Sequence, residues 1–232
     1  RCNDTVKLEY FKDTIGIYPG ALDQSLCNEM IEEFHRQRQG DVYEGFTLGG
    51  KNYRSKRTHE LNLKNTGNQL YDSWVETIED SAIRLNKRYL KKFGHLDKFN
   101  PLEVHGGGVY YPLWKIQEYK KNEGHYHAWH TEQNYSRDTS QRLMVSMFYL
   151  NDVPKGGETC FPLSDIKVTP EAGTLVTWPA GWPWVHNAEV PRSNDKYIIT
   201  SWMCANWWYD LELKDGVNEN GEKQLNWQYG KD

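Results

Sequence analysis

Apolar residues recur with a helical period in two stretches of the first ninety residues. The first stretch begins at Asp23 or Ser25, either of which can cap a helix. Its apolar side chains fall on one face and are Leu26, Met30, Ile31 and Phe34. The second stretch runs from near Asn68 to Phe93, with Gly94 as its stop, and its apolar face carries Leu70, Trp74, Ile78, Leu85 and Tyr89. The pattern predicts two amphipathic helices.

The segment between these helices has a different character. Residues Gly45–Arg57 have no apolar period and are rich in glycine, lysine and arginine, including Lys51, Arg54, Lys56 and Arg57. This composition predicts a mobile loop. Such a loop can fold over a substrate as a lid or remain a solvated connection, and the sequence leaves both roles open.

After Pro101 the pattern changes to short apolar runs separated by glycine and proline turns. The predicted strands are Val109–Tyr119, His125–Glu132, Leu143–Leu150, Glu158–Phe161, Thr174–Trp178 and Lys196–Met203. Short strands at this spacing favour a jelly roll or barrel, and no internal repeat is present. We predict a mainly β protein with one domain over residues 1–232. In it, residues 1–100 are mostly helical support, 101–210 form the β core and 211–232 form a C-terminal tail.

Composition and charge narrow the class of protein. Ten tryptophans and fifteen tyrosines among 232 residues suit a wide sheet or barrel, where one end of each ring is buried and the other finds a hydrogen bond. The formal charge of −4 gives no reason to expect tight binding to nucleic acid or a membrane surface. No run approaches the ~20 apolar residues that span a bilayer, and no signal-peptide core is present. The chain starts at Arg1, which is compatible with removal of an upstream segment, and the cytoplasm is weakly favoured.

The four cysteines, Cys2, Cys27, Cys160 and Cys204, are scattered and form no C-x-x-C pair. This spacing disfavours a zinc site or a redox motif. A chain of this length can build its own core, so we expect free buried thiols rather than two disulfides.

A His-x-Glu pair in the second predicted strand is the first candidate for chemistry. Residues two apart on a strand point to the same side, so His130 and Glu132 would project together. With one more ligand from a neighbouring strand, they would form the two-histidine, one-carboxylate site of non-haem Fe(II) oxygenases. The pair His125 and His127 also satisfies the alternation but brings no carboxylate. By itself a His-x-Glu pair is weak evidence for a metal site, because it often occurs by chance among exposed strand residues.

Two later residues strengthen this interpretation. His186 follows a turn rich in proline and glycine, and Lys196 stands ten residues later at the head of an apolar strand. A lysine that enters a buried strand needs a partner charge, which a dicarboxylic co-substrate would supply. A lysine that extends from the strand's edge into water is the alternative.

The stretch from Gln117 to Trp202 resembles the catalytic domain of the prolyl 4-hydroxylases, within the 2-oxoglutarate/Fe(II) dioxygenases. The matching motifs, in order, are Gln117-Glu118-Tyr119, His130-Thr131-Glu132, Arg142, Phe148–Val153, Gly156–Pro162, Val168-Thr169-Pro170 with Gly173, His186, Lys196 and Trp202. The resemblance covers a little over a third of the chain. Glu132 stands where the family has aspartate, which keeps the charge and disfavours a halogenase-like site.

The resemblance implies a double-stranded β-helix fold and a set of roles. Iron(II) would be held by His130, Glu132 and His186, and 2-oxoglutarate by Lys196 with help from the Tyr119 hydroxyl. Dioxygen would be the oxidant, succinate and CO2 the by-products, and ascorbate the reductant. Arg142 would contact the substrate or form a structural salt bridge. The expected substrate is proline in a peptide or protein, and the basic loop would favour an acidic residue nearby.

Alternatives remain at this point. The same chemistry can act on lysine, a free amino acid or a nucleobase, because the motifs concern only iron and the oxo-acid. A cupin-like module that holds metal without turnover is a different class, and it would have no use for Lys196. Trp178, Trp182 and Trp184 are candidates for the cavity entrance, although at least one of them suits core packing better.

Overall fold

The computed structural model describes residues 10–47, 50–93, 109–134, 137–205, 216–217 and 223–224. The helices are α1 (Gln24–Arg36), the 3-10 turn η1 (Gln37–Gln39), α2 (Gln69–Lys92) and α3 (Arg137–Ser140). The strands are β1 (Tyr10–Lys12), β2 (Ile15–Tyr18), β3 (Tyr43–Glu44), β4 (Lys56–Arg57), β5 (His59–Asn62), β6 (Val109–Tyr110), β7 (Lys115–Tyr119), β8 (His125–His130), β9 (Arg142–Tyr149), β10 (Thr159–Phe161), β11 (Ile166–Val168), β12 (Leu175–Pro179), β13 (His186–Ala188), β14 (Lys196–Ala205), β15 (Gly216–Val217) and β16 (Lys223–Gln224).

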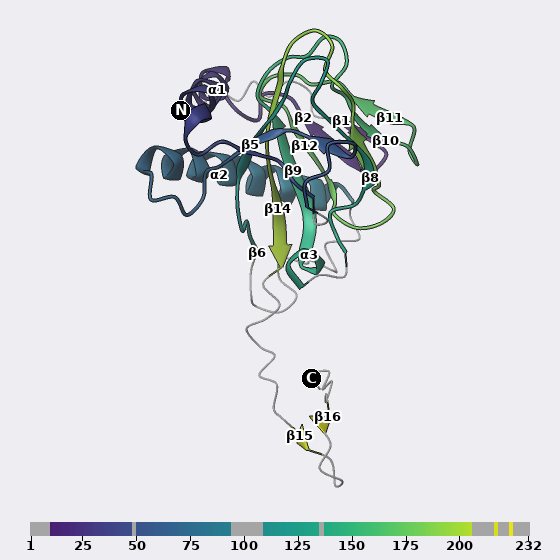
Figure 1. The fold of residues 1–232 in the computed structure, drawn as a ribbon. Coiled ribbons are helices and arrows are strands. Elements are labelled where there is room, and N and C mark those ends of the chain that lie inside the picture. The colour runs from purple at the N-terminus through teal and green to yellow at the C-terminus, as the bar shows by residue number, and fades with distance from the viewer. Residues whose placement is uncertain are drawn as a thin grey trace.

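Two antiparallel sheets form the body of the protein, as the sequence predicts. The larger sheet has the order β1-β2-β12-β9-β14-β7-β5-β3, with β6 paired to β14. The smaller sheet has the order β11-β10-β13-β8-β4. Figure 1 shows α2 crossing behind the larger sheet, while β8, β10 and β11 lie to one side of it. The fold is mainly β, with two antiparallel sheets and two N-terminal helices.

Strict alternation along β9 and β14 divides the interior into two cores. On β14, Tyr197 and Ile199 pack with the helices, whereas Ile198 and Trp202 pack between the sheets. Strand β9 alternates in the same way, with Phe148 on the helix side. Because side chains of a strand point to opposite faces in turn, one buried strand serves both cores. The face between the sheets is the one that carries the site.

Both predicted helices are present at the predicted places. Helix α1 begins after Asp23, and α2 begins after Asn68, whose side chain accepts a hydrogen bond of 3.0 Å from the Leu70 backbone N–H. The buried faces match the prediction except at Leu70, which is 42% exposed in the first turn of α2. The predicted stop at Gly94 lies outside the described residues.

The expectation that residues 1–100 are mostly helical support was incomplete. Strands β1 to β5 also belong to this region, and they extend both sheets. The predicted mobile loop Gly45–Arg57 is wrong at its C-terminal end, because Lys56 and Arg57 form β4 and pair with β8. These strands are too short for an alternating apolar pattern in the sequence to predict them.

Several smaller predictions can be checked in the same structure. Cys27, Cys160 and Cys204 are free and buried, as expected, and Cys2 lies outside the described residues. Predicted strand Val109–Tyr119 is divided into β6 and β7, and β11 and β13 were not predicted. In the described residues, no helix has the length and apolarity needed to cross a membrane. The division of residues 1–232 as one domain with a tail at 211–232 stays a prediction.

Candidate active site

Alternation along β8 brings His130 to the space between the sheets. Tyr126, Ala128 and His130 line a cavity there, whereas the rings of His125 and His127 stack on one another at 4.0 Å on the other face of the strand. Strand β13 pairs with β8 so that His186 lies directly opposite His130. The pairing register therefore brings two histidines together from positions 56 residues apart in the sequence, whereas the alternative pair His125 and His127 faces away.

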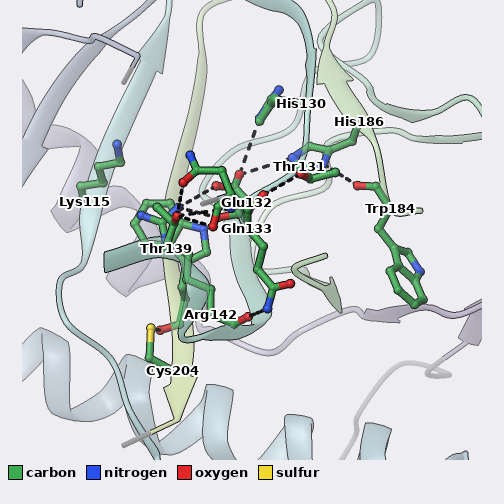
Figure 2. A network of polar contacts seen from close by, with 12 residues as sticks. Lys115, His130, Thr131, Glu132, Gln133, Thr139, Arg142, Trp184, His186 and Cys204 are labelled. Atoms are coloured by element: carbon green, nitrogen blue, oxygen red, sulfur yellow. Dashed lines mark hydrogen bonds and ion pairs between the residues drawn. The ribbon is translucent and has the colours of Figure 1, made fainter. Parts of the chain in front are cut away.

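Glu132 joins these histidines from a bend beyond the end of β8. Its backbone N–H, and that of Gln133, donate to the Ala180 carbonyl at 3.0 and 3.1 Å, which fixes the bend against the end of β12. Glu132 Oε1 lies 3.6 Å from His130 Nε2 and 3.4 Å from His186 Nε2. Figure 2 shows dashed lines from the carboxylate to both imidazoles. The expectation that Glu132 lies on the strand was wrong, although its side chain still reaches the position that the expectation required.

Hydrogen bonds at the far ring nitrogens orient both imidazoles. His130 Nδ1 lies 2.8 Å from the Ala128 carbonyl, and His186 Nδ1 lies 3.0 Å from the Trp184 carbonyl. A carbonyl can only accept, so each Nδ1 donates its proton to the carbonyl, and each Nε2 is the ring atom directed at Glu132. Aromatic rings hold the same orientation, because Tyr126 stacks on His130 at 3.8 Å and Trp178 packs edge-on against His186 at 4.9 Å.

The charge states of Glu132 and His186 suit a divalent cation. Burial alone would raise the pKa of Glu132, but hydrogen bonds and charge from His130 and His186 lower it well below its usual value. Burial, and then the charge of His130, lower the pKa of His186. An ionised carboxylate beside a neutral imidazole is the protonation state that a metal requires. The possible ligand atoms of the three residues lie within 4.8 Å of one another, so the group can hold a metal ion.

Arg142 completes the surroundings of Glu132. Its Nη1 donates to the Glu132 backbone carbonyl at 3.1 Å and to Oε2 at 3.2 Å, and its guanidinium carbon lies 3.6 Å from the centre of the Trp202 ring. Of the two predicted roles, the salt bridge is therefore present. Arg142 also lines the cavity, so a contact with substrate stays a prediction.

Lys196 is the other residue that the sequence singled out, and it is fully buried. It pairs across the sheet with Tyr119, and its ammonium group lies 4.9 Å from the centre of that ring. The ammonium donates to the Gly157 carbonyl at 2.6 Å. Gly157 has a φ of 77°, a conformation that favours glycine and sets the direction of this carbonyl.

No carboxylate in the described part of the chain forms an ion pair with Lys196, although the charges of Cys160 and Glu158 reach it. Burial therefore lowers the pKa of Lys196 to about 7. A buried ammonium with a single carbonyl acceptor is costly, and an anion would stabilise it. The Tyr119 hydroxyl donates to Gln117 Oε1 at 3.1 Å, so it is already engaged beside this lysine.

All of these groups line one cavity of about 590 Å³. This volume lies within the range of about 300–1,000 Å³ for small-molecule sites, so the cavity can hold more than a metal ion. Trp178 and Trp202 line it, while Trp182 is 78% exposed and Trp184 donates to Thr14 Oγ1 at 2.7 Å outside it. Of the three predicted entrance tryptophans, only Trp178 belongs to the cavity.

Sequence reasoning missed a second charged group in this cavity. Glu60 lies opposite Gln117 in the pairing of β5 with β7, and it accepts from Lys56 and Lys115. Lys115, Gln117 and Tyr119 alternate on β7, so alternation alone identifies Lys115 as a cavity residue. Nothing in the sequence near Glu60 indicates its place.

The comparisons with known proteins agree with this geometry. Residues 114–204 match the 2OG-Fe(II) oxygenase superfamily. The human transmembrane prolyl 4-hydroxylase is 29% identical in an alignment that covers 30% of this chain and 21% of that protein. The chain therefore aligns with about a fifth of the length of this curated relative.

Solved structures share the fold. The viral collagen prolyl hydroxylase from Paramecium Bursaria Chlorella virus-1, solved as a 2OG complex, has 17% identity and a TM-score of 0.59 over 83% of this chain and 97% of its own. A prolyl hydroxylase from Trichoplax adhaerens, in complex with a hypoxia inducible factor oxygen degradation domain peptide fragment, has 16% identity and a TM-score of 0.63 over 83% and 84%. The match to the 2OG-Fe(II) oxygenase superfamily thus covers residues 114–204, the part of the chain that contains His130, Glu132 and His186. The relatives named above are prolyl hydroxylases, and a further structural neighbour, from Burkholderia pseudomallei, is an oxidoreductase of the 2OG-Fe(II) oxygenase family.

Proposed function

We propose that this chain is an Fe(II)- and 2-oxoglutarate-dependent dioxygenase that hydroxylates proline in a peptide or protein. The superfamily implies iron and 2-oxoglutarate. The individual residue roles, the proline substrate and ascorbate as the reductant go beyond what the superfamily implies. The observation that carries the proposal is a buried Lys196, with no carboxylate partner among the described residues, in the same cavity as the His130–Glu132–His186 group.

The metal ligands would be His130, Glu132 and His186. Their donor set of two imidazole nitrogens and one carboxylate oxygen is typical of Fe(II) oxygenases and leaves positions for other ligands. When bound, iron supplies the oxygen chemistry, in which 2-oxoglutarate, O2 and a C–H bond become succinate, CO2 and an alcohol. The two backbone carbonyls at Nδ1 keep both imidazoles aimed at the metal position.

Lys196 would bind the distal carboxylate of 2-oxoglutarate. The ammonium has three donors, and the Gly157 carbonyl uses one of them. The Tyr119 hydroxyl would assist after it turns from Gln117. Since Lys196 is fully buried, the charge pair would form away from water, where it is stronger.

The substrate side would include Arg142 and Trp202. Arg142 lies against the ring of Trp202 and forms a wall of the cavity beside Glu132. Its position suits a hydrogen bond to a peptide carbonyl, and an extended proline-containing chain loses little entropy on docking beside aromatic rings. The names of the distant relatives support proline as the residue that is hydroxylated.

The decisive experiment measures succinate release with three groups of substrates: proline-rich peptides, free amino acids and oligonucleotides. We expect turnover with peptides, a mass gain of one oxygen on proline, and a higher yield with ascorbate. Turnover with free amino acids or oligonucleotides alone would contradict the proline substrate. Stoichiometric iron binding without any 2-oxoglutarate turnover would favour a metal-binding module instead.

A further inference from the structure

The cavity contains a second basic group that the proposed roles do not use. Lys56 from β4 and Lys115 from β7 both donate to the carboxylate of Glu60. Lys56 Nζ lies 2.5 Å from Oε1, and Lys115 Nζ lies 2.9 Å from Oε2. Lys56 is 4% exposed and Glu60 is 1% exposed, so their ion pair is buried in the interior and is not a surface ion pair. We call these three residues the lysine clamp.

Register and packing hold the lysine clamp in place. Glu60 also accepts from Gln117 Nε2 at 2.9 Å, and Gln117 lies directly opposite it on the neighbouring strand β7. The aromatic rings of the cavity flank the two ammonium groups. Lys56 Nζ lies 5.1 Å from the Tyr126 ring centre, and Lys115 Nζ lies 5.7 Å from the Trp202 ring centre. In the view of Figure 2, Lys115 lies on the side of Glu132 opposite His186.

The charges of the cavity do not balance. Lys56, Lys115, Arg142 and Lys196 line it, against two carboxylates, Glu60 and Glu132. Arg142 is paired with Glu132, and Lys196 is reserved for 2-oxoglutarate in the proposed function. One carboxylate then remains for two lysines. Burial, and then repulsion from Lys115, lower the pKa of Lys56. A second anion between the two ammonium groups would relieve that repulsion.

We infer that the lysine clamp recognises a carboxylate of the substrate, and that Lys56 and Lys115 determine specificity for an acidic group near the hydroxylated residue. This inference rests on the proposed function and narrows its substrate class. Each ammonium spends one of its three donors on Glu60, and no further acceptor is present among the described residues. A carboxylate between the two would accept from both.

The inference changes which basic residues matter. The sequence suggested that the whole loop Gly45–Arg57 would attract an acidic peptide. However, Lys51 pairs with Glu44 at 2.8 Å and Arg57 with Glu123 at 2.8 Å, both on the surface. Exposed pairs of this kind are worth little and are screened by salt. Selectivity should therefore come from Lys56 and from Lys115, which lies outside the loop.

The test compares neutral proline peptides in which one residue, from two before to three after the proline, is aspartate or its uncharged isostere asparagine. We expect at least one position where aspartate raises kcat/KM by about tenfold or more, as for a partly buried charge pair. Lys115→Met should abolish that preference without changing iron content or the KM for 2-oxoglutarate. Lys115→Glu should invert it in favour of lysine at the same position.

Two further variants complete the design. Lys56→Met should also reduce the preference, and Lys51→Met is the matched control, which should keep it. Succinate release in the absence of peptide confirms that each variant has a folded, loaded site. A peptide ending in proline as the free acid, compared with its amide, tests whether the carboxylate comes from the chain end.

The outcomes separate the inference from the proposed function. Equal rates for aspartate and asparagine peptides, or a preference that survives in Lys115→Met, would overturn the lysine clamp while leaving prolyl hydroxylation intact. A raised KM for 2-oxoglutarate in Lys115→Met would overturn it as well, because the lysines would then bind the co-substrate. Lys115-dependent turnover of a free carboxylic acid, with no peptide as substrate, would support the clamp and remove the proline proposal.

Discussion

At the scale of single residues, Glu132 shows how side-chain length and backbone position compensate. Glu132 lies beyond the C-terminal end of β8, in a bend that is fixed by hydrogen bonds to the Ala180 carbonyl. This bend directs its side chain toward His130 and His186. Glutamate has one methylene more than the aspartate of the family motif. In this chain the additional length places the carboxylate within 3.6 Å of both Nε2 atoms.

The first prediction follows from this length. Glu132→Asp withdraws the carboxylate by roughly 1.5 Å, one carbon–carbon bond, which exceeds the ~0.5 Å tolerance of a preorganised site. We expect iron affinity to fall by about tenfold or more, with the fold retained, as measured by metal titration under anaerobic conditions. Glu76→Asp, at an exposed position on α2, is the control. Unchanged iron affinity would show that the bend adjusts freely and that glutamate is not required here.

The second prediction concerns the proton on Lys196. Because its folded-state pKa is about 7, the Lys196 side chain is mostly a neutral amine at pH 8. An anionic ligand would favour the charged ammonium form. Binding of 2-oxoglutarate at pH 8 should therefore take up close to one proton. The apparent dissociation constant should rise by up to about tenfold for each pH unit above 7.

Calorimetric titration of the metal-loaded protein with 2-oxoglutarate, in two buffers of different ionisation enthalpy, measures this uptake. Lys196→Ala should abolish the uptake and weaken binding by a factor of roughly thirty or more, since one side of a buried charge pair is removed. Wild-type protein that binds 2-oxoglutarate without proton uptake would show that another cation holds the distal carboxylate.

At the scale of elements, the sequence predicts long periodic segments well and short strands poorly. Helices α1 and α2 each bury one repeating face, so their apolar period is visible in the sequence. The long strands β9 and β14 are buried on both faces and are visible as apolar runs. Strands β3 and β4 have two residues each, and their place comes from pairing with β5 and β8. No local pattern carries that information.

The residues of the candidate site also differ in how well the sequence predicts them. His130, Glu132, His186 and Lys196 could be named because the order and spacing of a family motif are local properties of the sequence. Glu60 could not be named, because its role arises from the register between β5 and β7. The salt bridge of Arg142 was one of two predicted roles, and only the bend at Glu132 decides that it forms.

The third prediction tests the faces of α2. Ile78 is fully buried, whereas Leu70 is 42% exposed, although both lie on the predicted apolar face. Ile78→Ala should cost about 2–5 kcal/mol of unfolding free energy through lost packing and a cavity. Leu70→Ala, the control, should cost less than about 1 kcal/mol. Urea unfolding with an unchanged m-value measures both, and similar losses for the two variants would contradict the helix orientation.

At the scale of the whole molecule, buried ionisable groups determine how stability depends on pH. Hydrogen bonds and charge from lysine and arginine outweigh burial and lower the pKa values of Glu60 and Glu118. Their contribution is fully present above the unfolded value of 4.5 and is lost as the pH falls through their folded pKa values. In contrast, burial raises the pKa of Cys27 and Cys204 to about 11 and that of Tyr111 to about 12. Those groups ionise first in the unfolded state, so stability falls above about pH 9.

Lys196 affects the pH of maximum stability between the losses in acid and in base. Its pKa is about 7 when folded and 10.5 in the unfolded chain, so between these values the unfolded state binds more protons and stability rises with pH. The fourth prediction is therefore a stability maximum between about pH 7 and 9, measured as the urea midpoint from pH 3 to 11.

Glu118 can test the loss of stability in acid without a change to the active site, because it pairs with Arg38 and Lys120 on the helix side of β7. Glu118→Gln should lower stability at pH 7 but lose less on acidification than wild type, whereas Glu76→Gln should follow the wild-type curve. A Glu118→Gln curve parallel to wild type would show that this carboxyl has the same pKa in the folded and unfolded states, and the loss of stability in acid would then have to arise elsewhere in the molecule.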